Sequence, residues 1–398
     1  MRTISRHSTF YDLLDALGKP GCAVCTIVAR TRWRYLDSLA YENVNDPGVR
    51  AKLRESFGFC TRHAWYFVDT VRELFGAAII YRDLLHTTQG LTAGATSANA
   101  LDPSAPCLAC QAEWDSAGYA IATLAEAIDE VDLRSAFDRS EGLCGPHLLR
   151  AMTVGRPGAR QKLLDAALGT WQHHADDPAR LRWRATGAAG NFATDDLALA
   201  ANPPAPRLSV SAPLEEPFTC PVCTGTRAEL GRLPSWESLD DGTGGLCNVH
   251  GWAPRGVGWS ALHRRQVTAL ATRAKELASA AGDLWLRQAM RGLGLGSTRS
   301  EPIPSPLRCV VCAHQAAVET ALCETIARPL CVPHLRRAVW IHGAGAIEAI
   351  KPTWRQLDQL LGEYLRKEDY RFRSEPRGIE QKSPRWIVAL FAGVPEIR

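Results

Sequence analysis

Twelve of the thirteen cysteines in this 398-residue chain follow one repeated spacing that also includes histidine. Each repeat, here called a cassette, is a C-x-x-C pair followed 18 to 34 residues later by a C-x-x-H pair. The four cassettes are Cys22, Cys25, Cys60 and His63; Cys107, Cys110, Cys144 and His147; Cys220, Cys223, Cys247 and His250; and Cys309, Cys312, Cys331 and His334. Three cysteines and one histidine complete the tetrahedral shell of a structural zinc ion. We therefore expect about four zinc ions per chain, each held by the two pairs of one cassette.

So many cysteines could instead form disulfide bonds. The redox state of the cellular compartment decides between disulfide bonding and metal binding. The N-terminal segment has neither the apolar run of about seven residues nor the cleavage site of a signal peptide. The longest apolar stretch near the other end, Trp386 to Val394, has nine residues, against the roughly 20 that a membrane-spanning helix needs. We therefore expect a cytoplasmic protein with no membrane segment and with reduced thiols. A disulfide framework also has no use for histidine at a fixed spacing, so metal is the preferred interpretation.

Iron–sulfur clusters are the alternative to zinc, because they also take thiolate ligands and tolerate one histidine. Covalent c-type haem requires C-x-x-C-H. It is excluded here, since the residues after the second cysteines are Thr26, Gln111, Thr224 and Ala313. A catalytic zinc keeps one coordination position open for water. Four protein ligands per ion thus predict structural metals that carry out no catalysis.

Apolar side chains recur at helical spacing around the cassettes. In the first cassette, Val24, Val28, Tyr35 and Leu39 share one face of a helix that begins at the C-x-x-C pair. A second helix is expected to open at the C-x-x-H pair, with a third behind it. The sequence predicts an all-α fold, built as a tandem array of about four three-helix units, each stapled by a three-cysteine, one-histidine metal site.

Segments rich in Gly, Ala, Ser and Pro divide the chain at 89–106, 186–217 and 292–308. The resulting boundaries predict unit one at 1–90, unit two at 101–185, a linker at 186–217, unit three at 218–291, unit four at 306–367 and a C-terminal tail at 368–398 that packs on the array. The longest linker separates two halves of two units each, a pattern typical of tandem duplication.

Two segments occur only once in the chain, in the first unit and in the tail. Their polar side chains are candidates for a ligand or partner site, and these are Glu42, Asp46, Arg50, Asp369, Tyr370 and Arg371. A structural interpretation competes with this one, because Asp before Pro is a strong signal for the start of a helix. The tail can equally pack back on the first unit, with Trp386 and Phe391 as anchors.

Two further residues lie close to the fourth cassette. Cys323 stands outside the repeat, and we interpret it as a small buried hydrophobic residue rather than as a redox group or an alternative metal ligand. His314 could compete with His334 as fourth ligand. We prefer His334, because its offset from the third cysteine matches that in the other cassettes.

The segments CAVC, AYENVNDPGVRAKLRESFGFCTRHAW and AIIYRDLL, together with RKEDYRFRSEPRG and SPRWIVALFAG near the C-terminus, carry a resemblance to a family. The chain resembles an uncharacterised bacterial domain-of-unknown-function family with paired C-x-x-C and GFC-x-x-H motifs and a terminal DYRF segment. The resemblance covers about a third of the chain and implies a bacterial, cytoplasmic, metal-binding protein. It brings no activity with it. The proline of the CPxC form is replaced by Ala23 in the first pair and kept as Pro221 in the third.

Saturated metals and repeated helices favour a non-enzymatic binding or scaffolding module with a protein partner that the sequence does not identify. Two alternatives stay open: an iron–sulfur electron-transfer protein, and an enzyme whose non-metal polar site is formed by the first unit and the tail. The sequence contains no nucleophile and base at catalytic spacing, no P-loop and no dinucleotide fingerprint. A net charge of +4, from 46 basic and 42 acidic residues, is too balanced for a dedicated nucleic-acid binder.

Overall fold

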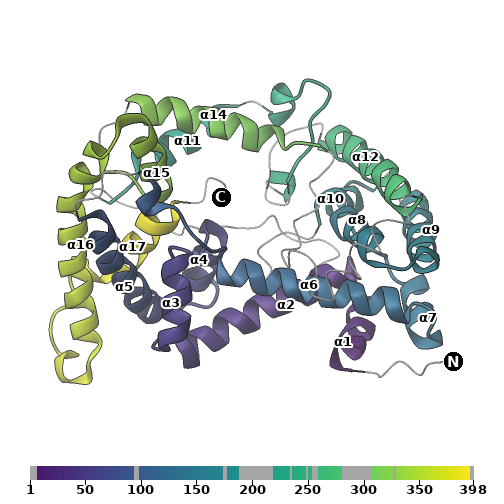
Figure 1. The fold of residues 1–398 in the computed structure, drawn as a ribbon, viewed down its shortest axis with the longest axis horizontal. Helices are drawn as coiled ribbons and strands as arrows, with labels where there is room; N and C mark the ends of the chain where they lie inside the picture. The colour runs from purple at the N-terminus through teal and green to yellow at the C-terminus, as the bar shows by residue number, and fades with distance from the viewer. Residues whose placement is uncertain are drawn as a thin grey trace. The chain divides into compact units, whose positions relative to one another are not determined.

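The computed structural model describes residues 7–93, 98–173, 177–187, 218–233, 235–247, 250–252, 259–279, 307–325 and 329–394. Within these residues the regular structure is helical, and the one β feature is an isolated bridge between Gly245 and Cys309. The helices of Figure 1 are α1 (Ser8–Leu17), α2 (Ala23–Ser38), α3 (Pro47–Glu55), α4 (Thr61–Asp69), α5 (Leu74–Thr92), α6 (Leu108–Ala127), α7 (Val131–Arg139), α8 (Gly145–Val154), α9 (Pro157–His173), α10 (Pro178–Thr186), α11 (Pro221–Arg232), α12 (Trp259–Ser279), α14 (Val310–Thr325), α15 (Val332–His342), α16 (Gly345–Glu368) and α17 (Ser383–Ala392). The all-α prediction is confirmed.

Short helical turns complete the described structure. A π-helical turn, η1 (Leu39–Asn43), continues α2, and the 3-10 turns are η2 (Ala98–Leu101), η4 (Trp236–Leu239), η5 (His250–Trp252), η6 (Tyr370–Phe372) and η7 (Ile379–Lys382). No helix in the described ranges combines the length and apolar character that crossing a membrane would require.

The cysteine that opens each ligand pair also opens a helical turn. The carbonyl groups of the first cysteines accept the backbone N–H four residues on, at 2.7 to 3.1 Å, and these eight cysteines are Cys22, Cys60, Cys107, Cys144, Cys220, Cys247, Cys309 and Cys331. Cysteine is not a favoured N-cap. A thiolate is nevertheless stabilised there, because the helix N-terminus carries a partial positive charge. The ligand pattern therefore dictates where the helices begin.

Contacts divide the chain into two compact units that are not consecutive in sequence. Unit 1 combines residues 1–31, 113–206 and 234–313, and unit 2 combines residues 32–112, 207–233 and 314–398. Each unit has its own cluster of buried apolar side chains. The array of four successive three-helix units is therefore not confirmed, and the boundaries expected at 1–90, 101–185, 218–291 and 306–367 do not coincide with these units.

In unit 1, α12 lies against α8, α9 and α10. Gln266 of α12 is buried, and its amide joins two segments: Nε2 donates to the carbonyls of Ala185 and Leu246 at 3.0 and 2.8 Å, while Oε1 accepts from the N–H of Leu246. Since Leu246 precedes Cys247, this amide holds the third C-x-x-H segment against the helical core.

In unit 2, α5 packs against both α16 and α17. The rings of Tyr81 and Phe391 are 5.7 Å apart, and Arg82 Nε donates to Asp358 at 2.8 Å. Trp386 packs on Phe218 with ring centroids 4.7 Å apart. The tail therefore packs on helices of the predicted unit one through α17, where Phe391 contacts Tyr81, while Trp386 contacts Phe218 beside the third cassette.

The expected linkers fall largely outside the described residues. Of the segment 186–217 the structure describes only residues 186 and 187, and of 292–308 only residues 307 and 308. In the segment 89–106, residues 89–92 belong to α5, and η2 is also helical. The alanines of this segment favour helix, so its Ala content did not by itself indicate a linker.

Two left-handed glycines of unit 2 provide a test of the packing. Gly58 has φ +85°, and a methyl group on it would lie 2.8 Å from Cε1 of the buried Tyr81, whereas Gly343 has φ +72° with open space around it. Because Gly343 also has ψ −165°, a combination essentially confined to glycine, we expect Gly343→Ala to cost about 1 to 3 kcal/mol from backbone strain. Gly58→Ala should cost about 1 to 3 kcal/mol more from overpacking. Thermal unfolding followed by circular dichroism measures both, and equal midpoints for the two variants would contradict the packing around Tyr81.

Candidate metal centres

The structure brings the sixteen predicted ligands into four groups, each of three cysteines and one histidine. In every group the ligand atoms all lie within 4.8 Å of one another. The groups are site I (Cys22, Cys25, Cys144, His147), site II (Cys60, His63, Cys107, Cys110), site III (Cys220, Cys223, Cys331, His334) and site IV (Cys247, His250, Cys309, Cys312). Four groups of the predicted composition, each able to hold a metal ion, are therefore confirmed.

The expected pairing within one cassette is wrong. Each site joins the C-x-x-C pair of one cassette to the C-x-x-H pair of its neighbour, so in each half of the chain an inner site, II or IV, is nested in sequence within an outer site, I or III. Sites I and IV belong to unit 1, and sites II and III belong to unit 2.

Helix rigidity explains why the local pairing fails. A helix begins at each C-x-x-C pair and rises 1.5 Å per residue. The 16 residues of α2 therefore carry the chain about 24 Å from Cys22, and the 20 residues of α6 carry it about 30 Å from Cys107. The next C-x-x-H pair in sequence is consequently delivered to a different place.

The distances between ligand atoms fit one four-coordinate ion per site. Bonds of about 2.3 Å to sulfur and about 2.05 Å to nitrogen at tetrahedral angles require Sγ–Sγ edges of about 3.8 Å and Sγ–Nδ1 edges of about 3.6 Å. The measured Sγ–Sγ distances are 3.7 Å in all four sites, for example between Cys25 and Cys144. The Sγ–Nδ1 distances run from 3.1 to 3.6 Å. In every site the histidine turns Nδ1 toward the sulfurs, which the sequence did not indicate.

The electrostatics of the sites call for a cation. Burial and the neighbouring thiols raise the pKa values of Cys144 and Cys331 well above the ordinary value of a cysteine thiol. Three thiolates therefore cannot be held together there without a positive charge between them, and a divalent ion supplies that charge.

Site III carries a second layer of polar contacts. Glu319 Oε1 lies 3.5 Å from His334 Nε2, and Glu319 is also bound by Gln315 at 2.9 Å and Arg337 at 3.0 Å. Burial alone would raise the pKa of Glu319, but the hydrogen bonds from His334 and Gln315 hold it at about 2. A carboxylate behind a ligating histidine fixes its ring and tautomer. Sequence reasoning missed this residue, since a Glu on a helix carries no signal of its own.

The end of α17 connects the two sites of unit 2. Thr61 Oγ1 donates to the carbonyl of Ala392, and Trp65 Nε1 donates to the carbonyl of Gly393 at 2.8 Å, so α17 is bonded to the helix that carries His63. A methyl group on Gly393 would lie 3.7 and 3.8 Å from the sulfurs of Cys223 and Cys331. The C-terminal segment therefore supports site II and closes over site III.

Cys323 and His314, the two further residues close to the fourth cassette, both lie outside the four ligand groups. Cys323 is fully buried in the core of unit 2 and belongs to none of the four sites, and burial raises its pKa. His314 is not part of a site either, and the group of Cys309 and Cys312 contains His250. The expectation that His334 joins Cys309 and Cys312 is therefore wrong, because His334 lies with Cys220, Cys223 and Cys331.

The candidate polar residues of the first unit have structural roles. Asp46 caps α3 by accepting the N–H of Val49 at 2.7 Å, and Arg50 Nε donates to the carbonyl of Val44 at 3.0 Å. Glu42 lies on the exposed side of η1 and accepts from Ser38 at 3.4 Å. The helix-start interpretation of the Asn-Asp-Pro turn is thus confirmed.

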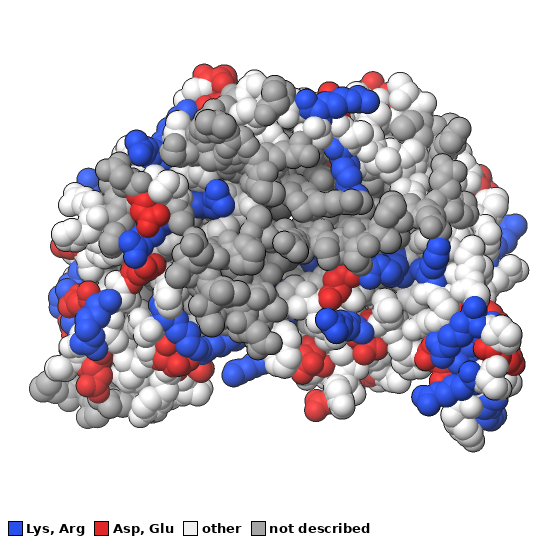
Figure 2. Space-filling view, turned by 180° about the vertical axis from the view of Figure 1, so that it is seen from behind, with Lys and Arg blue, Asp and Glu red and all other residues white. Residues whose placement is uncertain are grey.

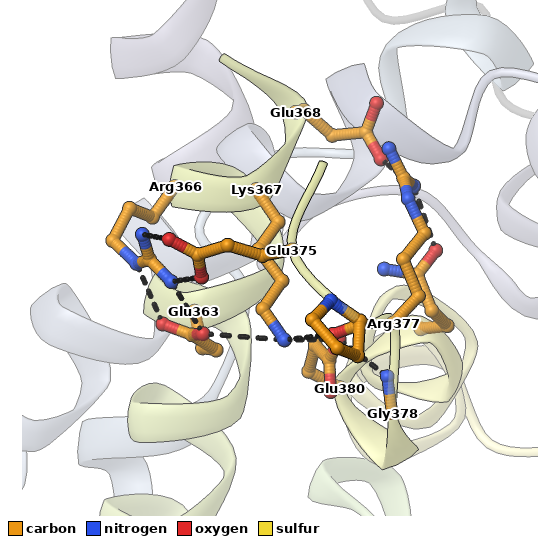
Figure 3. Close-up of polar contacts among 10 residues, drawn as sticks. Glu363, Arg366, Lys367, Glu368, Glu375, Arg377, Gly378 and Glu380 are labelled. Carbon is orange, nitrogen blue, oxygen red and sulfur yellow. Dashed lines mark hydrogen bonds and ion pairs between the residues drawn. The ribbon is translucent and has the colours of Figure 1, made fainter. Parts of the chain in front are cut away.

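An ion-pair framework holds the tail loop to the end of α16 (Figure 3). The guanidinium of Arg366 lies between Glu363 and Glu375, at 2.8 and 3.0 Å. Lys367 donates to the buried Glu380 at 3.0 Å and to the carbonyl of Pro376 at 2.7 Å. Arg377 pairs with Glu368 across the base of the same loop. These contacts fix residues 369–378 as a compact extension of the helix.

The other candidate residues lie in this loop. Hydrogen bonds from Arg371 hold the pKa of Asp369 at about 2, and the side chain of Tyr370 is 79% exposed. Within the described ranges, no hydrogen bond or ion pair joins these three residues to Glu42, Asp46 or Arg50. The structure does not assemble the six residues into one site.

Comparison with known proteins gives one limited likeness. The chain is similar to a protein described as "uncharacterized 23.9 kDa protein in xynA 3'region" from Caldicellulosiruptor sp. (strain Rt8B.4), with 31% identity over 75 residues. The match covers 19% of this chain and 36% of that protein. No protein-family model and no solved structure matches the chain.

The nested pairing predicts metal stoichiometries that differ from those of local pairing. Removing Cys22, Cys25, Cys144 and His147 together should abolish one site, so the purified variant should lose one ion per chain. Removing Cys22, Cys25, Cys60 and His63 should abolish two sites and lose two ions, because a remaining half-site has only two ligands. Elemental analysis of both quadruple variants checks this. Two ions lost in the first and one in the second would restore the pairing within one cassette.

Proposed function

We propose that this chain is a zinc protein whose four ions are structural and whose role is to bind or scaffold a protein partner. The observation that carries the proposal is the saturation of each site by four protein ligands at tetrahedral distances. A saturated ion has no position for water or substrate, so its contribution is to the fold.

The compactness of the ligand groups supports zinc over iron–sulfur clusters. In a cluster, protein ligands bind different irons, so their atoms stand farther apart than ligands on a single ion. Here all four ligand atoms of each site lie within 4.8 Å of one another. Zinc is the ion that most commonly occupies three cysteines and one histidine in tetrahedral geometry.

A reducing location is part of the proposal. All thirteen cysteines are free thiols in the structure. Thiols in such number stay reduced in the cytoplasm, where zinc binding competes with no disulfide. A bacterial cytoplasmic location is accordingly the compartment that this proposal includes.

The tail loop of unit 2 is the proposed partner contact. Tyr370 projects into solvent from a loop that three sets of ion pairs hold in place. Arg373 follows in the same exposed turn. Tyrosine and arginine dominate binding hot spots, and a pre-ordered loop loses little entropy on binding. On the face drawn in Figure 2, Lys and Arg are interspersed with Asp and Glu over the described residues. This mixture differs from the continuous basic patch of a nucleic-acid-binding surface.

Metal analysis under anaerobic conditions tests the metal assignment. We expect a colourless protein with four zinc ions per chain. Chelation under reducing conditions should remove much of the helical circular dichroism, because a structural zinc contributes roughly 10 to 16 kcal/mol against a net domain stability of about 5 to 15 kcal/mol. A brown protein that contains iron and sulfide, or a metal-free protein of unchanged helicity, would overturn the proposal.

Site-specific photo-crosslinking tests the binding surface. A crosslinking residue at position 370 should capture a defined partner, while the same residue at position 119 serves as control, since Tyr119 is 68% exposed but belongs to unit 1. The purified partner should then bind Tyr370→Ala at least tenfold more weakly than it binds Tyr119→Ala. Equal affinities for the two variants would remove the loop from the interface.

A further inference from the structure

The four metal sites differ in how far their sulfurs are shielded from solvent. Every ligand of site III is buried, site I has three buried ligands, and site II is half-buried apart from His63. Site IV contains Cys312, which is the one exposed cysteine of the thirteen. All sites have the same ligand set, and the exposed sulfur of Cys312 sets site IV apart from the others.

Site IV also differs in the backbone around its ligands. In sites I, II and III the C-x-x-H pair opens an α-helix, namely α8, α4 and α15. In site IV the described residues that follow Cys247 form the turn η5. What holds the two ligand segments of site IV together is backbone pairing: the N–H of Gly245 donates to the carbonyl of Arg308 at 2.8 Å, and the N–H of Val310 donates to the carbonyl of Gly245 at 3.1 Å.

A second thiol is placed to react with an oxidised Cys312. The sulfur of Cys247 lies 3.7 Å from that of Cys312, and the backbone pairing keeps the two segments adjacent when the ligand shell opens. A sulfenic acid next to a second cysteine condenses to a disulfide. An accessible thiolate with a resolving cysteine is the arrangement that redox-sensitive cysteines share.

We propose that Cys312 is the site at which hydroperoxides oxidise this protein, with Cys247 as the resolving cysteine and loss of the ion from site IV alone. The proposal rests on the zinc assignment above. It makes site IV a regulatory element of unit 1, while sites II and III maintain unit 2.

The reaction balances with one hydrogen peroxide per site. The thiolate of Cys312 attacks one peroxide oxygen, the O–O bond breaks, and the hydroxide that leaves takes a proton to form water. The thiolate of Cys247 then attacks the sulfur of the sulfenic acid, forms the S–S bond and displaces a second hydroxide, which is also protonated. Two thiolates are oxidised, one peroxide is reduced to two waters, and site IV keeps two of its four ligands, Cys309 and His250.

The experiment uses the full-length protein after its metal content has been measured. Hydrogen peroxide is added in steps, released zinc is followed with a metallochromic dye, and the remaining thiols are alkylated and located by mass spectrometry. We expect one of four ions to leave first, together with a Cys247–Cys312 disulfide, while the ligands of site III remain protected.

Matched variants separate this outcome from general oxidation. Cys312→His keeps four ligands of types that zinc accepts but removes the exposed thiolate, and Cys110→His makes the same change at the half-buried position of site II. With four ions bound, Cys312→His should slow the first release at least tenfold, and Cys110→His should not.

Three results would overturn the proposal. They are release of all ions together, a first disulfide in another site, and a first zinc release from Cys312→His that is as fast as from the parent protein. If Cys312→His does not retain a fourth ion, the order of thiol oxidation in the parent protein decides alone. A preparation without zinc would instead refute the metal assignment, and the initial metal analysis shows that before any oxidant is added.

Discussion

The convergence of two ligand pairs from distant parts of the chain into one group of three cysteines and one histidine is the constraint on which this structure depends. Each pair is short and local, and each opens a helical turn through the carbonyl of its first cysteine. A pair supplies only two ligands, so a site forms only when two such turns meet. The measured Sγ–Sγ and Sγ–Nδ1 distances leave room for one ion of ordinary bond lengths. The four ligand groups therefore mark which helix starts lie together.

Nested pairing distributes the metals in a way that a linear array would not. Each half of the chain contributes one site to unit 1 and one to unit 2. The helices that follow the ligand pairs then pack with helices from the other half, such as α12 on α8 in unit 1 and α16 on α5 in unit 2. Folding of either unit thus requires both halves, although their sequences read as successive repeats.

The non-repeated segments of the first unit and the tail stabilise helices and ligand groups, and they do not form a shared polar site. Asp46 caps α3. In the tail, the carbonyl of Gly393 accepts from Trp65 beside site II, and a methyl group on Gly393 would contact two sulfurs of site III. The segment before it, with Arg366 and Lys367, is tied to the end of α16. What these segments leave exposed is the turn with Tyr370.

The sequence by itself determined the ligands, their composition and the helical class, because spacings such as C-x-x-C are local and helical periodicity is read within one segment. It also offered Asp46 as a helix start and a packed tail with Trp386 and Phe391, each as one of two interpretations. Only the tertiary structure decided which pairs share an ion, since rigid helices such as α2 and α6 carry each pair away from its neighbour in sequence. The role of Glu319 behind His334 and the exposure of Cys312 were decided there as well. Both depend on which segments pack around a residue, and that is a property of the fold rather than of any local pattern.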